Sequence, residues 1–428
     1  MTTLSDPPQA EGFRLAQLVN DTRYRAYTFQ FIAIVLLILS FGWLINNAMN
    51  NPTLREVGID FGFLRQPAGY DIGQQPIPYT SQSTHLRAAV IGAMNTLIVA
   101  FLACITATLF GVIAGVLRLS KNWIIGKLMA IYVEMFRNIP VLIWIIIIFT
   151  IFANVLPQPS AFRGDDATAR PVFGIVAFTN RGVYVPRPYF TNGIGAQEPA
   201  EVEVDGVTTL VAQEVTSSAN WLIVLGVLIA SAVAAKVVTA RAARIQAATG
   251  VRPATLLPLL AIWILPIAIT LFVLGLKWEI PTLRGFNFQG GITLQNPLLA
   301  LWFALAIYTG AFIAENVRAG ILAISGGQTE AAAALGLRPR RIMGLVVLPQ
   351  ALRVIIPPLI SQYLNITKNT SLAIAVGYMD LTGTLGGITL NQTGRALECI
   401  MLLMAFYLSF SLIISAVMNV YNNSVRLK

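Results

Sequence analysis

The chain has 428 residues, of which 56% are hydrophobic and 11% are charged, and its mean hydropathy is +0.70. Soluble domains have a charged share of about 25%, so this composition excludes an ordinary soluble protein and indicates an integral membrane protein. The formal net charge of +10 does not indicate a nucleic-acid partner, because the lysines and arginines lie in short segments between apolar runs.

Apolar runs long enough to cross a bilayer recur along the whole chain. A transmembrane helix needs roughly 20 mostly apolar residues, and the sequence predicts an all-α integral membrane protein with about eight such helices. The first run is longer than the roughly 7 to 15 apolar residues of a signal peptide, so we expect it to be a retained anchor. The predicted spans centre on residues 28–45, 89–117, 128–156, 221–238, 256–276, 298–317, 345–378 and 399–420.

The residue types that most often bind metals are sparse. Cys104 and Cys399 lie in or at the edge of predicted spans, without the spacing of a metal site, so we expect neither a disulfide nor a bound metal. The single histidine, His85, stands beside Arg87 in a polar stretch. It is expected to be a solvated side chain.

The basic residues predict an orientation. If the N-terminus is cytoplasmic, every cytoplasmic segment carries Lys or Arg, as the positive-inside rule requires, and both termini lie in the cytoplasm. Residues 157–220 hold more acidic than basic side chains, which suits the outer face. Within them, VEVDGVTTLV at 202–211 alternates around an Asp-Gly turn and predicts a β-hairpin.

A small-residue segment interrupts the spans on the predicted cytoplasmic side. Residues 330–359 read EAAAALGLRPRRIMGLVVLPQALRVIIPPL. We expect a helix after Gly327, with Glu330 in its first turn and Gly336 as its C-terminal cap. Pro339 is placed to open a second short helix, which Pro349 should interrupt. The segment suits close approach by another protein, and the alternative is a basic connector lying on lipid headgroups.

This segment resembles the EAA loop of binding-protein-dependent ABC permeases, whose coupling helix docks in a groove of the ATPase subunit. The resemblance rests on EAA at 330–332, Gly336 and VVLP at 346–349. MNTLIVA at 94–100 and the stretch from 116 to 142 are similar to the first core spans of polar amino-acid permeases. The resemblance covers residues 89–156 and 298–425 and implies five core spans. The residues that it implies in ATPase coupling are Glu330, Ala331, Ala332, Gly336 and Arg340.

The rest of the chain departs from the minimal permease. The expected parts are an anchor with an outer segment (1–88), the first part of the core (89–156), a periplasmic insertion with two extra spans (157–297) and the second part of the core (298–428). GIDFGFL at 58–64 and PAGYDI at 67–72 resemble permeases of general L-amino acid and glutamate/glutamine/aspartate/asparagine uptake systems of Gram-negative bacteria. The outer part of the insertion is expected either to touch the binding protein or to form a passive cap.

The resemblance implies partners and a location. They are an ATPase dimer, a second permease subunit that is either a copy or a sister chain, a periplasmic amino-acid-binding protein and L-amino acid substrates, in the bacterial inner membrane. Gly126 and Lys127 are followed by Leu128 rather than by Ser or Thr, so no phosphate-binding loop is expected. The chain should therefore not be an enzyme, and ATP and Mg²⁺ should bind the partner ATPase.

A lysine stands in the predicted seventh span, within LNITKNTSLAIAVG at 364–377. A charge at the centre of a span costs roughly 2.5 to 3.5 kcal/mol on insertion scales. One interpretation is an ion pair of Lys368 with Asp380 or Glu398. The other is a site for the carboxylate of an amino acid, formed by Lys368 with neutral hydrogen-bonding groups beside it. The predicted substrate-binding residues are Lys368, Asn369, Thr370 and Ser371, with Thr367 beside them and Asn95 from the second span.

Related permeases often read Lys-Asp-Thr-Ser-Leu where this chain has Asn369, and the loss of that acid implies weaker selection for cationic side chains. A competing hypothesis is an ion-coupled secondary amino-acid transporter, which needs acids inside the membrane. The candidates are Glu134, Glu315, Asp380 and Glu398. We expect local pairing instead, because Arg137 and Arg318 follow the first two of these acids by three residues.

Overall fold

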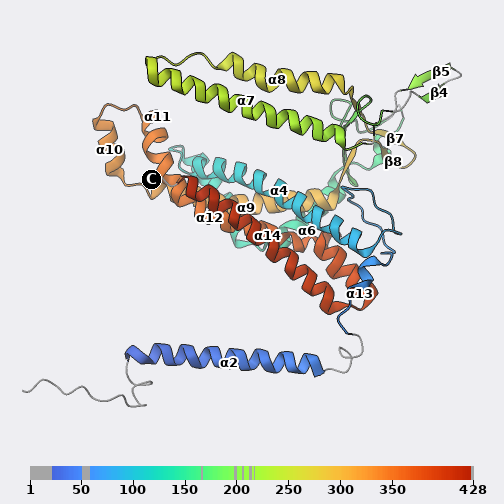
Figure 1. Ribbon diagram of the computed structural model, residues 1–428, viewed down its shortest axis with the longest axis horizontal. Helices are drawn as coiled ribbons and strands as arrows, with labels where there is room; N and C mark the ends of the chain where they lie inside the picture. Colours follow the sequence, from blue (N-terminus) through green and yellow to red (C-terminus); the bar gives the residue numbers. More distant parts are fainter. Residues whose placement is uncertain are drawn as a thin grey trace, which may run out of the picture.

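A computed structural model describes residues 22–50, 58–164, 167–196, 200–204, 207–211, 215 and 217–425. Within these residues, seven helices are long and apolar enough to cross a membrane, or up to eight if one bent pair forms a span. The protein is mostly helical, as predicted. Figure 1 shows the long helices running between two ends of the molecule, one with α10 and α11 and the other with the strands.

The core is built around α9 (Asn296–Leu322), the most buried of the long helices. Small residues let α4 (His85–Arg118) approach it closely. A Cβ atom on Gly115 would lie 2.6 Å from the backbone oxygen of Ala314, and one on Gly111 would lie 2.6 Å from Ile313. These glycines are four residues apart and therefore lie on one face of α4, the arrangement by which small residues bring membrane helices together.

The predicted third span is two helices with a sharp bend between them. Helix α5 (Trp123–Asn138) and helix α6 (Val141–Val155) meet at an angle of 108°. Ile139 is extended, with φ −104° and ψ 133°, because the ring of Pro140 disfavours the helical conformation of the preceding residue. The predicted span over 128–156 is therefore not one straight helix, and it is the eighth candidate span if the bent pair crosses the membrane together.

The predicted seventh span is continuously helical over Pro339–Val376. It comprises α11 (Pro339–Ile342), a π-helical turn η3 (Met343–Val347), α12 (Leu348–Asn369) and a 3₁₀ helix η4 (Thr370–Val376). Pro349 does not interrupt it, contrary to prediction, because Pro349 lies in the first turn of α12 and Leu348 donates to Met343 across the π turn. The break falls at Gly377, whose φ is +72°.

After this break the chain forms a second π helix and turns into the last long helix. The π helix η5 (Thr382–Thr389) leads into α13 (Leu390–Thr393), and α14 (Ala396–Val425) follows. Leu381, Leu385 and Cys399 are buried together with Phe63 of a short 3₁₀ helix, η1 (Gly62–Arg65). The outer segment before α4 therefore packs on the region just before α14.

His85 is buried beneath that outer segment, so the expectation of a solvated histidine was wrong. It is the first residue of α4, and its Nδ1 lies 3.0 Å from Oγ1 of Thr389. The ring of Phe63 lies edge-on to it. The sequence could not show this, because Thr389 is 304 residues away along the chain.

A small β module, named the outer β module after its predicted side of the membrane, is assembled from two pieces of chain that flank α7 (Ala219–Thr249) and α8 (Leu256–Val273). Strand β2 pairs with β1 and β9, and β3 pairs with β6, so the module joins residues from before and after the helix pair. The predicted hairpin is confirmed, since Val204 of β4 pairs with Val207 of β5. The elements are η2 (Pro159–Phe162), β1 (Ala177–Thr179), β2 (Gly182–Val185), β3 (Arg187–Phe190), β4 (Ala200–Val204), β5 (Val207–Val211), β6 (Leu276–Glu279), β7 (Thr282–Arg284), β8 (Asn287–Gln289) and β9 (Ile292–Gln295).

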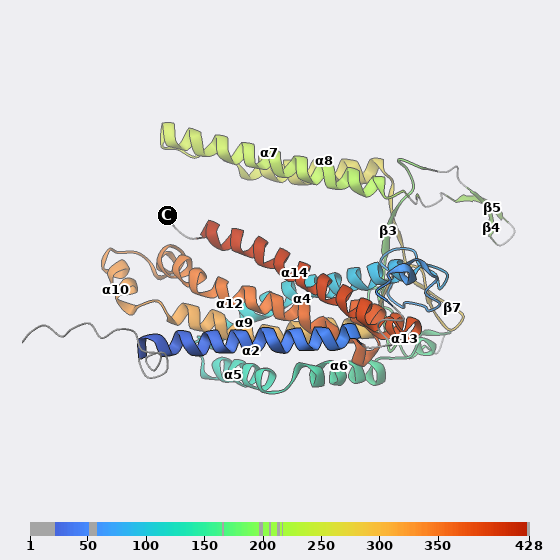
Figure 2. The same ribbon diagram turned by 60° about the horizontal axis from the view of Figure 1, so that its bottom comes forward.

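Four long helices have little or no buried apolar surface, and α14 is the one of them that packs on α12. None of the apolar window of α2 (Thr22–Asn50) or of α8 is buried, and α7 is buried over only 17% of its window. Helices α7 and α8 lie side by side and apart from α4 and α9 in both views (Figures 1 and 2). Their apolar side chains are exposed over the length of a bilayer, which suits contact with lipid or with another membrane helix.

Candidate functional site

The loop that resembles the EAA segment forms two short helices at one end of the molecule (Figure 1). Helix α10 (Gly326–Ala334) ends as predicted at Gly336, whose φ is +77°. The N–H of Leu337 donates to the oxygen of Ala332, and the N–H of Gly336 donates to that of Ala333. This pair of bonds is the Schellman motif, which needs a left-handed residue at the position of the glycine.

Helix α10 is fastened to the spans on both sides of it. Ala332 is buried against Ile342 and Val347, with Ile321 of α9 and Leu337 packed beside them. The same cluster therefore joins the end of α9, α10, α11 and the start of the seventh span. Because its apolar members are packed together, a displacement of α10 should be passed to α9 and α12.

The predicted coupling residues divide between the inside and the outside of this loop. Ala331, Arg340 and Gly336 are exposed, whereas Ala332 faces the chain's own core. Glu330 is exposed but lies beyond the first turn, contrary to prediction, because α10 starts at Gly326. The adjoining Leu335 is 82% exposed, a large apolar side chain that sequence reasoning had not singled out.

An ion network joins α4, α5 and α9 at the same end of the helices. Glu315 accepts from Arg318, with an N–O distance of 2.7 Å, and also bonds Arg118. The local pairing of Glu315 with Arg318 is thus confirmed. Glu134, however, pairs with Arg118 at 3.6 Å rather than with Arg137, whose guanidinium lies over the ring of Phe312. Arg118 comes from the far end of α4, so local spacing could not reveal its part.

Lys368 lies in the last turn of α12 and is exposed. Among the described residues it forms no ion pair, because the two acids proposed as its partners are engaged elsewhere. Asp380 accepts from the N–H of Gly383 at 2.8 Å and from Tyr407 at 3.3 Å. Glu398 accepts from the N–H of Asp60 at 3.0 Å and pairs with Arg395 at 3.3 Å. The predicted alternative of a structural ion pair is therefore wrong for this conformation.

The neighbours of Lys368 do not converge on one point. Thr367 and Thr370 are buried, and their hydroxyls donate to backbone oxygens within the helix. Ser371 likewise donates to the backbone oxygen of Lys368 itself. Successive residues of a helix point in different directions, and of this predicted set only Lys368 and Asn369 keep donors that no described group takes up.

Asn95 is fully buried and ties three segments together. Its Nδ2 donates to the backbone oxygens of Gln74 and Met379, each at 2.9 Å, and the hydroxyl of Tyr378 donates to its backbone oxygen at 3.2 Å. Only its Oδ1 lacks a partner in the described structure. The structure does not bring Asn95 to Lys368, and its role toward substrate stays a prediction.

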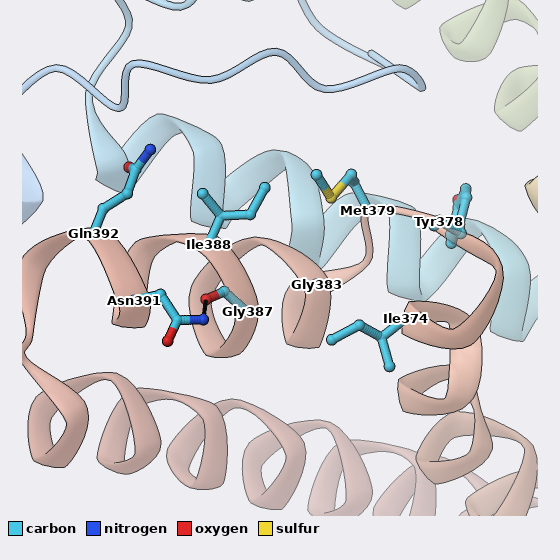
Figure 3. A pocket seen from close by; sticks show the side chains of 9 residues that line it. Ile374, Tyr378, Met379, Gly383, Gly387, Ile388, Asn391 and Gln392 are labelled. Carbon is cyan, nitrogen blue, oxygen red and sulfur yellow. Dashed lines mark hydrogen bonds between the residues drawn. The ribbon is translucent and has the colours of Figure 1, made fainter.

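A cavity of about 510 Å³ opens beside the break in the seventh span (Figure 3). Ile374, Met379 and Ile388 give it apolar walls, and Asn391 and Gln392 lie at its other end. The amide of Asn391 donates to Gly387 at 2.7 Å. None of the predicted substrate residues lines this cavity, although η4, which contributes Ile374, directly follows Lys368 and Asn369.

A buried helical core with several apolar helices and a loop of two short helices at one end describe a multi-pass membrane protein. Residues 223–426 match the family of the binding-protein-dependent transport system inner membrane component. A relative that is 49% identical over the whole chain shows that the chain belongs to this family of ABC permeases, so it is a transport subunit of the inner membrane and not an enzyme. Permeases of this family work with a separate ATPase and a binding protein.

Several relatives match nearly the whole chain. The glutamate/glutamine/aspartate/asparagine transport system permease protein BztB of Rhodobacter capsulatus is 49% identical over 437 aligned residues, which cover 100% of both chains. The general L-amino acid transport system permease protein AapQ of Rhizobium johnstonii is 38% identical over 98% of this chain and 97% of its own. A crystal structure of an amino acid ABC transporter with histidines aligns at 17% identity, covering 79% of this chain and 95% of that chain, with a TM-score of 0.42, a likeness too weak to inform the site.

The family assignment decides between the two transport mechanisms considered from the sequence. An ion-coupled transporter needs acids that are available to bind the ion. Each of the four acids considered has a polar partner in the structure, and membership of the ABC permease family identifies the protein as a subunit of an ATP-driven system. The acids instead fasten helices and loops to one another. They are Glu134, Glu315, Asp380 and Glu398.

Proposed function

We propose that this chain forms the membrane pathway for L-amino acids, among them glutamate, glutamine, aspartate and asparagine. The carrying observation is the near full-length similarity to permeases named for those substrates. In the proposed complex, an ATPase dimer binds at α10, a second permease subunit lies beside the core, and a periplasmic binding protein docks on the outer β module. The second permease is either a copy of this chain or a sister chain.

The proposed orientation places both termini in the cytoplasm. The turn after α4, the connection between α7 and α8, the α10–α11 loop and the C-terminal end of α14 all lie at one end of the molecule (Figure 1). The first three of these carry Lys121, Arg252 and Arg338 with further basic residues. The strands lie at the opposite end. This separation of basic segments from the β module supports the predicted orientation, because short cytoplasmic loops are enriched in Lys and Arg.

Single cysteines test this orientation. In a chain with Cys104 and Cys399 replaced by alanine, Ala196→Cys should react with an impermeant thiol reagent added from the periplasmic side. Ala254→Cys, between α7 and α8, should react only after the cytoplasmic side is opened. Both alanines are exposed, so access depends on the membrane alone. The reverse pattern of labelling would overturn the orientation.

The proposed coupling surface is the exposed side of α10. Ala331 and Ala333 leave its backbone accessible to a close partner, and Leu335 offers an apolar side chain that no described residue covers. The buried cluster around Ala332 then carries the motion of α10 to α9 and α12. Such rigid-body transmission can alternate access to a central site, with ATP binding on the partner supplying the bias.

The proposed substrate contact is Lys368, with Asn369 beside it. An exposed ammonium with no described ion-pair partner suits a carboxylate, which every amino acid carries. Asn369 supplies a neutral amide where an acid would favour cationic side chains. Ser371, Thr370 and Asn95 remain proposed members of this site in a conformation that frees their donors, since here these donors bond to the backbone.

A further inference from the structure

The hairpin of α7 and α8 carries a basic patch whose ligand the transport function does not explain. We define this patch as Lys236, Arg241, Arg244 and Arg252, all of which are exposed. There is no Asp or Glu between Ala219 and Val273. None of the four forms an ion pair within the described part of the chain, so four positive charges stand together without a counter-charge on the hairpin.

The lengths of the two helices place this patch relative to a bilayer. At about 1.5 Å per residue, the 18 residues of α8 span about 27 Å, close to the roughly 30 Å of a hydrocarbon core. The 31 residues of α7 span about 46 Å. The excess lies toward its C-terminal end, where the chain needs residues 250–255 to return to the start of α8 (Figure 1). The basic patch therefore lies where α7 leaves the hydrocarbon and passes the headgroups.

The rest of the hairpin indicates what surrounds it. The apolar side chains of α8 are exposed along its length, and α7 has few buried residues. The exposed apolar side chains of this helix pair suit contact with lipid along its sides. Gly250, with φ +73°, closes α7 and turns the chain so that Arg252 follows on the same side of the membrane. Guanidinium groups bind phosphate oxygens by paired hydrogen bonds.

We propose that the basic patch binds the headgroups of anionic phospholipids, and that the hairpin thereby anchors the permease to lipids such as phosphatidylglycerol. Which leaflet holds these lipids depends on the orientation given under the proposed function, whereas the binding of the lipids does not depend on it. Basic residues just outside a membrane span attract anionic headgroups, with a contribution that corresponds to about a 5-fold preference per charge. The proposal assigns a lipid partner to a hairpin that the transport pathway leaves unexplained.

The test uses the purified full complex in nanodiscs of phosphatidylcholine with a minor fraction of phosphatidylglycerol. Native mass spectrometry then counts the lipids of each class that remain bound. The variant Arg241→Gln with Arg244→Gln should lose preference for phosphatidylglycerol by roughly 25-fold, two factors of about 5. Lys236 and Arg252 remain in it to hold the membrane topology. Arg241→Lys with Arg244→Lys should keep most of the preference.

A matched control removes one charge from the turn between α4 and α5 and one from the start of α5. Lys121→Gln with Lys127→Gln lies on the same side of the membrane, and both lysines are exposed, so it should leave the preference within about twofold of the unchanged complex if the hairpin holds the site. The proposal would be overturned if both double variants lost the preference for phosphatidylglycerol equally. It would also be overturned if the variant Arg241→Gln with Arg244→Gln kept that preference in full. Loss of the second permease or of the ATPase, with lipid binding unchanged, would assign the patch to a protein partner instead. The readout needs neither ATP nor substrate, so a wrong transport assignment would not affect it.

Discussion

At the scale of single residues, Lys368 has no counter-charge among the described residues, whereas the acids of the helical core are bonded to other groups. Arg118 and Arg318 both bond Glu315, and Asp380 accepts from Gly383 and Tyr407. An ammonium in the last turn of a membrane helix needs an anion, a carbonyl or water. The carboxylate of the transported amino acid is the anion that we propose.

The change Lys368→Met keeps the length of the side chain and removes the charge. Hydrogen bonds to charged groups contribute about 1.5 to 3 kcal/mol, so uptake at limiting substrate should fall roughly 10- to 100-fold. Copurification of the ATPase should be unchanged, because Lys368 contacts no other charged group in the described structure. Lys127→Met, at an exposed lysine of α5, is the control and should transport normally. Normal uptake by the Lys368 variant would remove this residue from the site.

The change Asn369→Asp introduces the acid of the Lys-Asp-Thr-Ser-Leu pattern that the resemblance implies at this position. A carboxylate beside the substrate attracts cationic side chains by about 1 to 4 kcal/mol at separations near 4 Å. In competition assays with the same binding protein, preference should move several-fold from glutamate toward arginine or lysine. If the order of preference stays the same, specificity is set elsewhere along the pathway.

The environments of single residues were the hardest feature to predict from the sequence. The positions of Lys368 and Gly336 could be predicted because their chemistry is local to one helix or one cap. His85 and Asn95 could not, since each is fixed by groups on distant segments, Thr389 for the former and Met379 for the latter. For Asn95 the available signal was an amide in an apolar run, whereas His85 stands in a polar stretch and gave no such signal.

At the scale of elements, the C-terminal cap of α10 depends on Gly336, and one substitution there should destabilise it. Gly336 has φ +77° and no atom near its missing Cβ, so a larger side chain there is opposed by the backbone rather than by crowding. A β-branched residue in the left-handed region is strained by about 1 to 2 kcal/mol or more. The Schellman bonds to Ala332 and Ala333 should weaken and the exit of α10 should change direction.

We therefore expect Gly336→Val to lower substrate-stimulated ATP hydrolysis of the complex severalfold. Gly250→Val is a close control, because that glycine also ends a helix with φ +73° and open space around it, but lies outside the coupling loop. The control should retain stimulation. Equal hydrolysis in the two variants would show that the geometry of this cap does not govern coupling.

The packing of α4 on α9 allows a second test of an element. A Cβ added to Gly115 would lie 2.6 Å from the backbone oxygen of Ala314, and overpacking of this kind costs about 1 to 3 kcal/mol. Gly115→Ala should lower the thermal unfolding temperature of the purified complex by several degrees. Gly226→Ala on α7, where nothing lies within 4 Å, should leave that temperature unchanged or raise it slightly. The opposite ranking would contradict the close contact of α4 with α9.

At the scale of the whole molecule, the spans could be predicted from hydropathy and the outer module could not. Apolar length is a local property, so α2, α4, α9 and α14 were expected near their observed positions. The bend between α5 and α6 was marked by Pro140, but its angle depends on packing. The pairing of β3 with β6 joins strands on either side of the α7–α8 hairpin, and no local pattern encodes such a long-range partner.

The central claim is ATP-driven import of amino acids through this chain. Proteoliposomes that hold the purified complex, with ATP enclosed and binding protein outside, should accumulate labelled L-glutamate. Vanadate, which blocks the ATPase, should abolish the accumulation, and an uncoupler should leave it unchanged. Accumulation that survives vanadate and collapses with the uncoupler, or the failure of every L-amino acid to accumulate although substrate-independent ATP hydrolysis is intact, would contradict the claim.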